Sequence, residues 1–73
     1  MKSTVVVDAD PLLSGVSEAL NRSALLGWRA WHHPGRNMAV AVRGVFLPDY
    51  AAVLERAGYR VEREAGWLTV TAA

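Results

Sequence analysis

Apolar residues recur every three or four positions in the first third of the chain, which predicts an amphipathic helix. Four residues would share one face of that helix: Leu13, Val16, Leu20 and Ala24. Asp10 followed by Pro11 predicts its start, because the carboxylate accepts hydrogen bonds from free amides and proline suits the first helical position. Gly27 is predicted to end the helix by taking the left-handed conformation.

The same spacing returns in the second half of the chain and predicts a second helix. Pro48 is predicted to open this helix, with Asp49 in its first turn, and Gly58 is predicted to close it. Its apolar face would be formed by Tyr50, Val53, Leu54 and Ala57.

Alternating apolar and polar residues predict four strands, and a short run of valines predicts a fifth. The predicted strands span residues 4–7, 28–33, 38–43, 59–64 and 67–71. Residues 34–37 and 65–66 contain the glycine and proline of two hairpin turns. The predicted order is therefore β-α-β-β-α-β-β, in a single domain that spans residues 1–73.

This order predicts a small two-layer α+β sandwich, in which two helices cover one face of an antiparallel sheet. The first six elements are those of the ferredoxin-like, split-βαβ arrangement, and the seventh is an extra C-terminal strand. A weak internal repeat supports an alternative, because LGWRAW with MAVAV is followed by AGYRVE with WLTVT. In that alternative the chain is built as αββ–αββ, and the first strand is only an arm.

The alternation also predicts which side chains face the helices. Charged neighbours place Tyr59 and Val61 in the core, and the repeat then places Trp28 and Ala30 there. The other inward residues would be Met38, Val40, Val42, Leu68 and Val70. The opposite sheet face would carry tryptophans among arginines, a combination enriched at protein interfaces. The predicted partner-binding residues on this face are Arg29, Trp31, Arg43, Arg60, Trp67 and Thr69.

The composition limits what such a domain can do. Hydrophobic residues make up 52% of the 73 residues, although a chain of this size buries only about 60% of its unfolded surface. We therefore expect some apolar surface to be buried against a second copy or a larger protein. The absence of cysteine excludes disulfides and thiolate zinc sites. The net charge of +1, without a basic cluster, makes nucleic acid a less favoured partner.

The chain contains no apolar run of about 20 residues, the length that a membrane-spanning helix requires. Its first residues, MKSTVVVDADP, also lack the long apolar segment of a signal peptide. We therefore expect a cytoplasmic protein that has no contact with membrane.

Two short motifs resemble metal sites. His32 and His33 are weak candidates for metal ligands, but neighbouring strand residues point to opposite faces and no carboxylate lies nearby in the sequence. Asp8 and Asp10 form a D-x-D motif without the phosphate-binding loop that phosphoryl-transfer sites need. We expect turn-flanking histidines, a structural role for Asp10 as helix cap, and no bound metal.

The glycine-rich nucleotide-binding motifs and the nucleophile elbow do not occur in this chain. We expect no enzymatic activity and no cofactor. The sequence predicts a homodimeric protein-interaction module of the accessory or inhibitor kind, such as phages and mobile elements encode, which acts through the open sheet face. One alternative is single-stranded nucleic-acid binding, with Trp31 and Trp67 stacked on bases. Another is a small-molecule or metal-sensing regulatory domain.

Overall fold

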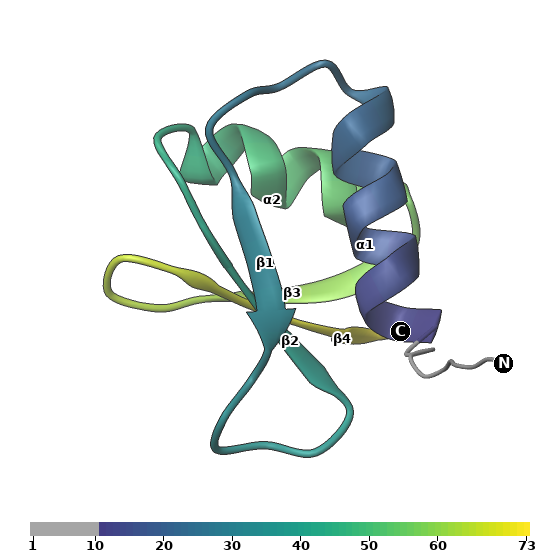
Figure 1. Cartoon of the computed structure of the whole chain (residues 1–73), viewed down its shortest axis with the longest axis vertical. Helices are drawn as coiled ribbons and strands as arrows, with labels where there is room; N and C mark the ends of the chain where they lie inside the picture. The colour runs from purple at the N-terminus through teal and green to yellow at the C-terminus, as the bar shows by residue number, and fades with distance from the viewer. Residues whose placement is uncertain (1–10) are drawn as a thin grey trace, which may run out of the picture.

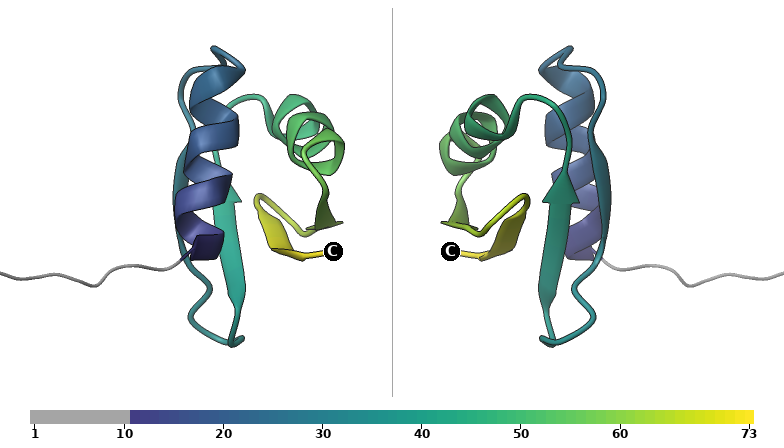
Figure 2. Two further views of the ribbon diagram at one scale, coloured as in Figure 1. Left: turned by 90° about the vertical axis from the view of Figure 1, so that its right-hand side faces the viewer. Right: turned by 90° about the vertical axis from the view of Figure 1, so that its left-hand side faces the viewer.

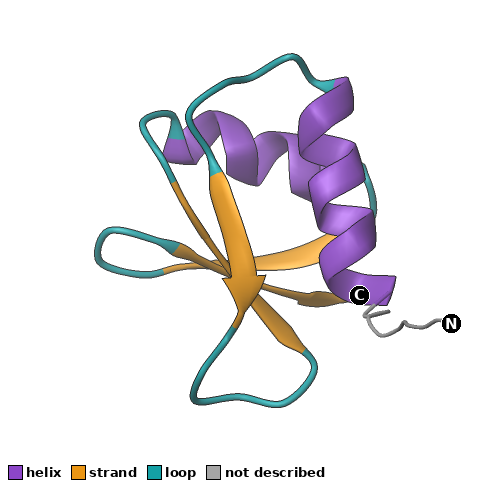
Figure 3. Ribbon diagram, in the orientation of Figure 1, coloured by secondary structure: helices purple, strands orange, loops and turns teal. Residues whose placement is uncertain are grey.

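Two helices lie on one side of a four-stranded antiparallel sheet in the computed structural model, which describes residues 11–73 (Figure 1). The helices are α1 (Pro11–Arg22) and α2 (Leu47–Arg56). The strands are β1 (Arg29–His32), β2 (Ala39–Arg43), β3 (Tyr59–Arg63) and β4 (Leu68–Ala72). These elements, coloured by type in Figure 3, confirm the predicted α+β sandwich. The strand predicted at residues 4–7 and the predicted cap Asp10 lie outside the described residues.

The order of strands across the sheet is β1-β2-β4-β3, and every neighbouring pair is antiparallel. The sequence predicts the last strand as an addition to a split-βαβ arrangement, but β4 lies inside the sheet, between β2 and β3. The reason is that β1 with β2 and β3 with β4 form hairpins, which join through their second strands. The described residues therefore follow the αββ–αββ alternative.

The two hairpins have the same cross-strand register, so their strand positions can be matched one to one. Positions in β3 follow those in β1 by 31 residues (60 − 29), and positions in β4 follow those in β2 by 28 (71 − 43). The first hairpin turn is therefore three residues longer than the second (31 − 28). The equivalent pairs are Arg29–Arg43 with Arg60–Thr71, Ala30–Val42 with Val61–Val70, Trp31–Ala41 with Glu62–Thr69, and His32–Val40 with Arg63–Leu68.

Each helix covers the hairpin of its own half, since α1 packs on β1 and β2 while α2 packs on β3 and β4 (Figure 2). The predicted inward direction is confirmed for the central strands, whose core residues are fully buried. This core consists of Val16, Leu20, Tyr50, Ala51 and Leu54 from the helices and Val40, Val42, Leu68 and Val70 from the sheet. Trp28 is partly buried against the same cluster.

The end of α1 differs from the prediction. The helix ends at Arg22, five residues before Gly27, so the prediction that Gly27 closes it is wrong. The Ser23 hydroxyl donates to the Leu20 carbonyl at 2.6 Å and satisfies one of the last helical acceptors. Ala24 then takes the left-handed conformation, with φ of 63°. Gly27 also has a positive φ, of 80°, but it lies in the loop that leads to β1.

The ends of α2 lie where the sequence places them. Pro48 is in the first turn of this helix, where its missing amide removes no hydrogen bond. At the other end, Gly58 has a φ of 101°, and its amide donates to the Glu55 carbonyl at 3.0 Å. This left-handed glycine turns the chain directly into β3.

Met38 does not face the core as predicted. Its φ is 58° and the residue is 85% exposed, because the longer first turn extends to this position and β2 begins only at Ala39. A left-handed residue interrupts the alternation of side chains along a strand. Met38 consequently lies outside the inward set, although the valines that follow it belong to that set.

A single buried tyrosine joins the two halves at one end of the sheet. Tyr50 of α2 donates its hydroxyl proton to the Leu26 carbonyl at 2.7 Å, and its ring meets that of Phe46 edge to face, 6.3 Å between centroids. Gly44 lies against the same ring. A Cβ at position 44 would lie 2.6 Å from Tyr50 Cε2 and 2.7 Å from the Gly27 carbonyl oxygen. The absence of a side chain at Gly44 is therefore necessary for this junction.

We expect Gly44→Ala to lower the free energy of unfolding by about 3 kcal/mol, because the added methyl group overlaps both a buried ring and a backbone carbonyl. Gly66→Ala is the matched control, since Gly66 has a positive φ of 86° but open space around its missing Cβ. This control should cost only about 1 kcal/mol of backbone strain. Urea unfolding followed by circular dichroism measures both values, and equal losses would contradict the clash.

Candidate binding site on the open sheet face

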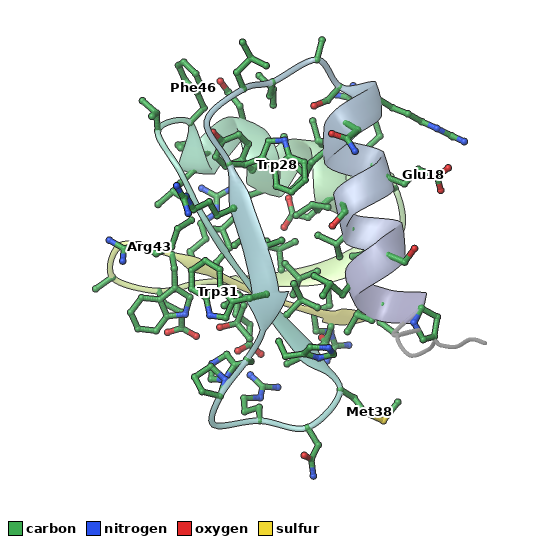
Figure 4. All side chains as sticks on the ribbon, in the orientation of Figure 1. Glu18, Trp28, Trp31, Met38, Arg43 and Phe46 are labelled. Carbon is green, nitrogen blue, oxygen red and sulfur yellow. The ribbon has the colours of Figure 1, made fainter. Side chains whose placement is uncertain are left out.

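The sheet side away from the helices, here called the open face, carries side chains in rows that cross all four strands. The central row is fixed by the register, in which Trp31 is opposite Ala41, Ala41 is opposite Thr69, and Thr69 is opposite Glu62. Arg29 and Arg43 lie opposite each other in the next row. Figure 4 shows Trp31 and Arg43 on the side of β1 away from α1, whereas Trp28 lies between β1 and the helices.

The open face contains a hollow of about 180 Å³, here called the tryptophan hollow. Its lining is formed by Trp31, His33, Pro34, Ala41, Arg43 and Trp67. Three of these residues are predicted binding residues from separate parts of the sequence: Trp31, Arg43 and Trp67. The fold therefore brings β1, the end of β2 and the residue before β4 to one place.

The floor of this hollow is Ala41, and Thr69 lies beside it, hydrogen-bonded to Trp67. Ala41 and Thr69, which are opposite each other on the two central strands, are both buried even though no helix covers this face. Trp31 remains 38% exposed beside them. Because alanine and threonine leave space above the sheet, the flanking indoles can form walls instead of covering a large central side chain.

Trp67 is held in place by a short chain of hydrogen bonds. Its indole Nε1 donates to the Thr69 hydroxyl at 3.3 Å, and that hydroxyl donates to Glu64 Oε2 at 3.2 Å. The Glu64 amide also donates to the Trp67 carbonyl at 2.9 Å across the turn. One wall of the hollow is thus anchored at its polar edge, and Thr69 acts beneath the site as a positioning residue.

Positive charge lies on the β1 and β2 half of the open face. Arg29 and Arg43 face each other across the two strands, and neither forms an ion pair within the described residues. The indole nitrogen of Trp31 likewise donates no hydrogen bond to any residue from 11 to 73. Directly opposed like charges destabilise a strand pair, so an anion between the two guanidinium groups would be favoured.

Charges of both signs lie on the β3 half, where Arg60 and the Arg36 guanidinium accompany two carboxylates. Glu62 and Glu64 both belong to the open face, and Glu62 accepts a hydrogen bond from Arg36 at 3.0 Å. Arg36 belongs to the first hairpin turn, so this contact shows that the turn reaches across the open face to β3. Arg60, a predicted binding residue, is opposite Thr71 on the edge strand and does not line the hollow.

The two histidines do not belong to a cluster of potential metal ligands within residues 11–73. His33 lines the hollow, and its Nδ1 accepts a hydrogen bond from the Gly35 amide at 3.0 Å. His32 points to the other face of the strand. Over residues 11–73 no three acidic or histidine side chains lie close enough together to hold a metal ion. Strand alternation already places His33 on the open face with Trp31, whereas Pro34 is brought into the hollow only by the folded turn.

A second exposed apolar surface, here called the end patch, lies at the junction of two loops. It is formed by Leu26, Val45 and Phe46, whose exposed fractions are 76%, 77% and 45%. The sequence contains one indication of it, since these apolar residues flank loop glycines and fit neither helical nor strand periodicity. Unlike the tryptophan hollow, this patch has no charged residue among its three members.

Comparison with known protein families, curated proteins and solved structures finds no match to this chain. Within the described part of the chain, neither helix has the length and hydrophobicity needed to traverse a bilayer. The site must therefore be interpreted from its own geometry.

We expect Thr69→Val to release Trp67, because valine has the same shape as threonine but offers no hydroxyl to the indole nitrogen. The cost should be about 1–2 kcal/mol of unfolding free energy. The indole N–H resonance of Trp67 should move in a ¹H–¹⁵N spectrum. Thr71→Val is the control on the same strand and face, and the Trp67 signal should stay in place there. An unchanged signal in Thr69→Val would contradict the anchoring.

Proposed function

We propose that this chain is a small non-enzymatic interaction module of the accessory or inhibitor kind, acting in the cytoplasm by binding a partner polypeptide. The observation that carries the proposal is the tryptophan hollow, in which Trp31 and Trp67 flank Ala41 and Arg43 lies at the rim. Tryptophan and arginine are the residue types most enriched among energetic hot spots of protein interfaces.

The dimensions of the hollow favour a protruding group of a polypeptide. A space of about 180 Å³ accepts one large apolar side chain and is small for a drug-sized ligand or cofactor. Anchoring a single side chain in a desolvated pocket is a common way for an interface to concentrate its binding energy.

Single-stranded nucleic acid is a second candidate, and the observation that favours it is the presence on one face of two tryptophans and two arginines that form no ion pair within residues 11–73. Indoles can stack on bases and arginines can contact phosphates. The Glu64 carboxylate acts against this candidate, because a phosphate backbone that crosses the sheet would meet it, whereas Glu62 is paired with Arg36. The polypeptide remains the better match to the charges of the face.

The proposal is tested by capture experiments with wild-type protein, Trp31→Ala and Leu26→Ser. Trp31→Ala removes one wall of the hollow, whereas Leu26→Ser changes the end patch to a similar extent. We expect partner capture from a lysate to be lost with Trp31→Ala, by about 2 kcal/mol or more in binding free energy, and kept with Leu26→Ser. The bound partner is identified by mass spectrometry.

The other outcomes separate the alternatives. Loss with Leu26→Ser but not with Trp31→Ala would assign binding to the end patch and contradict the proposal. Light scattering of the same three proteins tests the predicted homodimer: a dimer lost only in Trp31→Ala would make a second copy the occupant of the hollow. Capture of nucleic acid that disappears steeply with added salt would replace the polypeptide by the second candidate.

A further inference from the structure

We propose that the partner segment carries a carboxylate two residues away from the large apolar side chain that enters the tryptophan hollow. This inference rests on the proposed function and adds the chemistry of the ligand. It follows from the position of Arg29 and Arg43 relative to the hollow and from the separation of charges across the open face.

The arginine pair provides the site for the carboxylate. Arg29 and Arg43 are directly opposite each other, are exposed, and form no ion pair within residues 11–73. A guanidinium group binds a carboxylate through two parallel hydrogen bonds, and a carboxylate placed between two such groups relieves their repulsion. Arg43 also lines the hollow, so the anion site and the apolar site are adjacent.

The spacing of residues along β1 and β2 sets the distance between the two ligand side chains. Arg29 and Trp31 are two residues apart on β1, as are Arg43 and Ala41 on β2. Residues two apart in extended chain are separated by about 7 Å and point to the same side. An extended segment lying along these strands therefore presents side chains i and i+2 to the sheet with the same separation. One would enter the hollow, and the other would meet the arginines.

The charges near β3 limit how far negative charge can extend along the bound segment. Glu62 and Glu64 lie on the open face, beyond Ala41 and Thr69. Glu62 is already paired with Arg36, whereas the Glu64 carboxylate accepts a hydrogen bond from the Thr69 hydroxyl. A single carboxylate above Arg29 and Arg43 avoids this region, but a continuous polyanion across the sheet would not. The face is thus complementary to an isolated acidic residue next to an apolar one.

The test is selection of a random-peptide library, displayed on phage, against wild-type protein, followed by binding measurements with the selected peptide. We expect enriched peptides to contain aspartate or glutamate two positions from a leucine, phenylalanine or similar residue. Replacing that acid by its amide should weaken binding about tenfold, and so should the variant Arg29→Gln/Arg43→Gln. Arg63→Gln is the charge control, because Arg63 is exposed on β3 and belongs to the opposite side of the strand.

Each other result overturns a defined part of the argument. Selected peptides without an acidic residue, bound equally by Arg29→Gln/Arg43→Gln but lost in Trp31→Ala, would overturn this inference and leave the proposed function standing. Peptides retained by Trp31→Ala, or no enrichment over that variant, would overturn both. Tighter binding of an oligothymidylate than of any selected peptide would make a nucleic acid phosphate, and not a peptide carboxylate, the group recognised by the arginines.

Discussion

The antiparallel pairing of β2 with β4 is the interaction on which the rest of the structure depends. It joins the two αββ halves, brings Val40 against Val70 and Val42 against Leu68 in the core, and sets Ala41 opposite Thr69 on the other face. Since side chains alternate along a strand, the same register that buries the valines also places the small residues on the open face. A shift of one residue would bury Ala41 in the core and remove the floor of the tryptophan hollow.

The hollow arises because the two hairpins share a cross-strand register but differ in their side chains and in the length of their turns. In the shared register, Trp31 corresponds to Glu62, Arg43 corresponds to Thr71, and Arg29 corresponds to Arg60. The first half therefore supplies an aromatic wall and a cationic rim, while the second supplies the polar anchors for Trp67. The open face therefore carries the Arg29–Arg43 pair on its β1–β2 side and charges of both signs near β3. That asymmetry is what would give a bound segment its orientation.

The sequence predicts those parts of the fold that depend on local patterns. Alternation identifies the hairpins and places Trp31 and Trp67 on one face, because β-branched residues such as Val40 and Val70 mark the buried side. The central position of β4 is not predictable in this way, since it depends on how two hairpins meet and not on residues within one strand. The early end of α1 was missed because the Ser23 hydroxyl and a left-handed Ala24 stop the helix before the expected glycine.

The binding site is predictable to a similar extent. The tryptophans, Arg43 and His33 follow from strand alternation, whereas Pro34 joins the hollow only because the long turn folds toward the open face. Arg60 was predicted from the same alternation, but it is opposite Thr71, at the other end of the β3–β4 hairpin from Trp67, and two strands away from the β2 residues of the hollow. Distances along a strand can be inferred from sequence, and distances across a sheet require the order of its strands.

The proposed function requires the partner to contact the side of the sheet on which Trp31 and Trp67 lie. The most direct measurement is ¹⁹F NMR of protein labelled with 5-fluorotryptophan, whose three signals are assigned by tryptophan-to-phenylalanine variants. Addition of the bound segment should move the Trp31 and Trp67 signals and leave that of Trp28, which packs on the helix side of the sheet. A shift confined to Trp28 under saturating ligand would contradict the account.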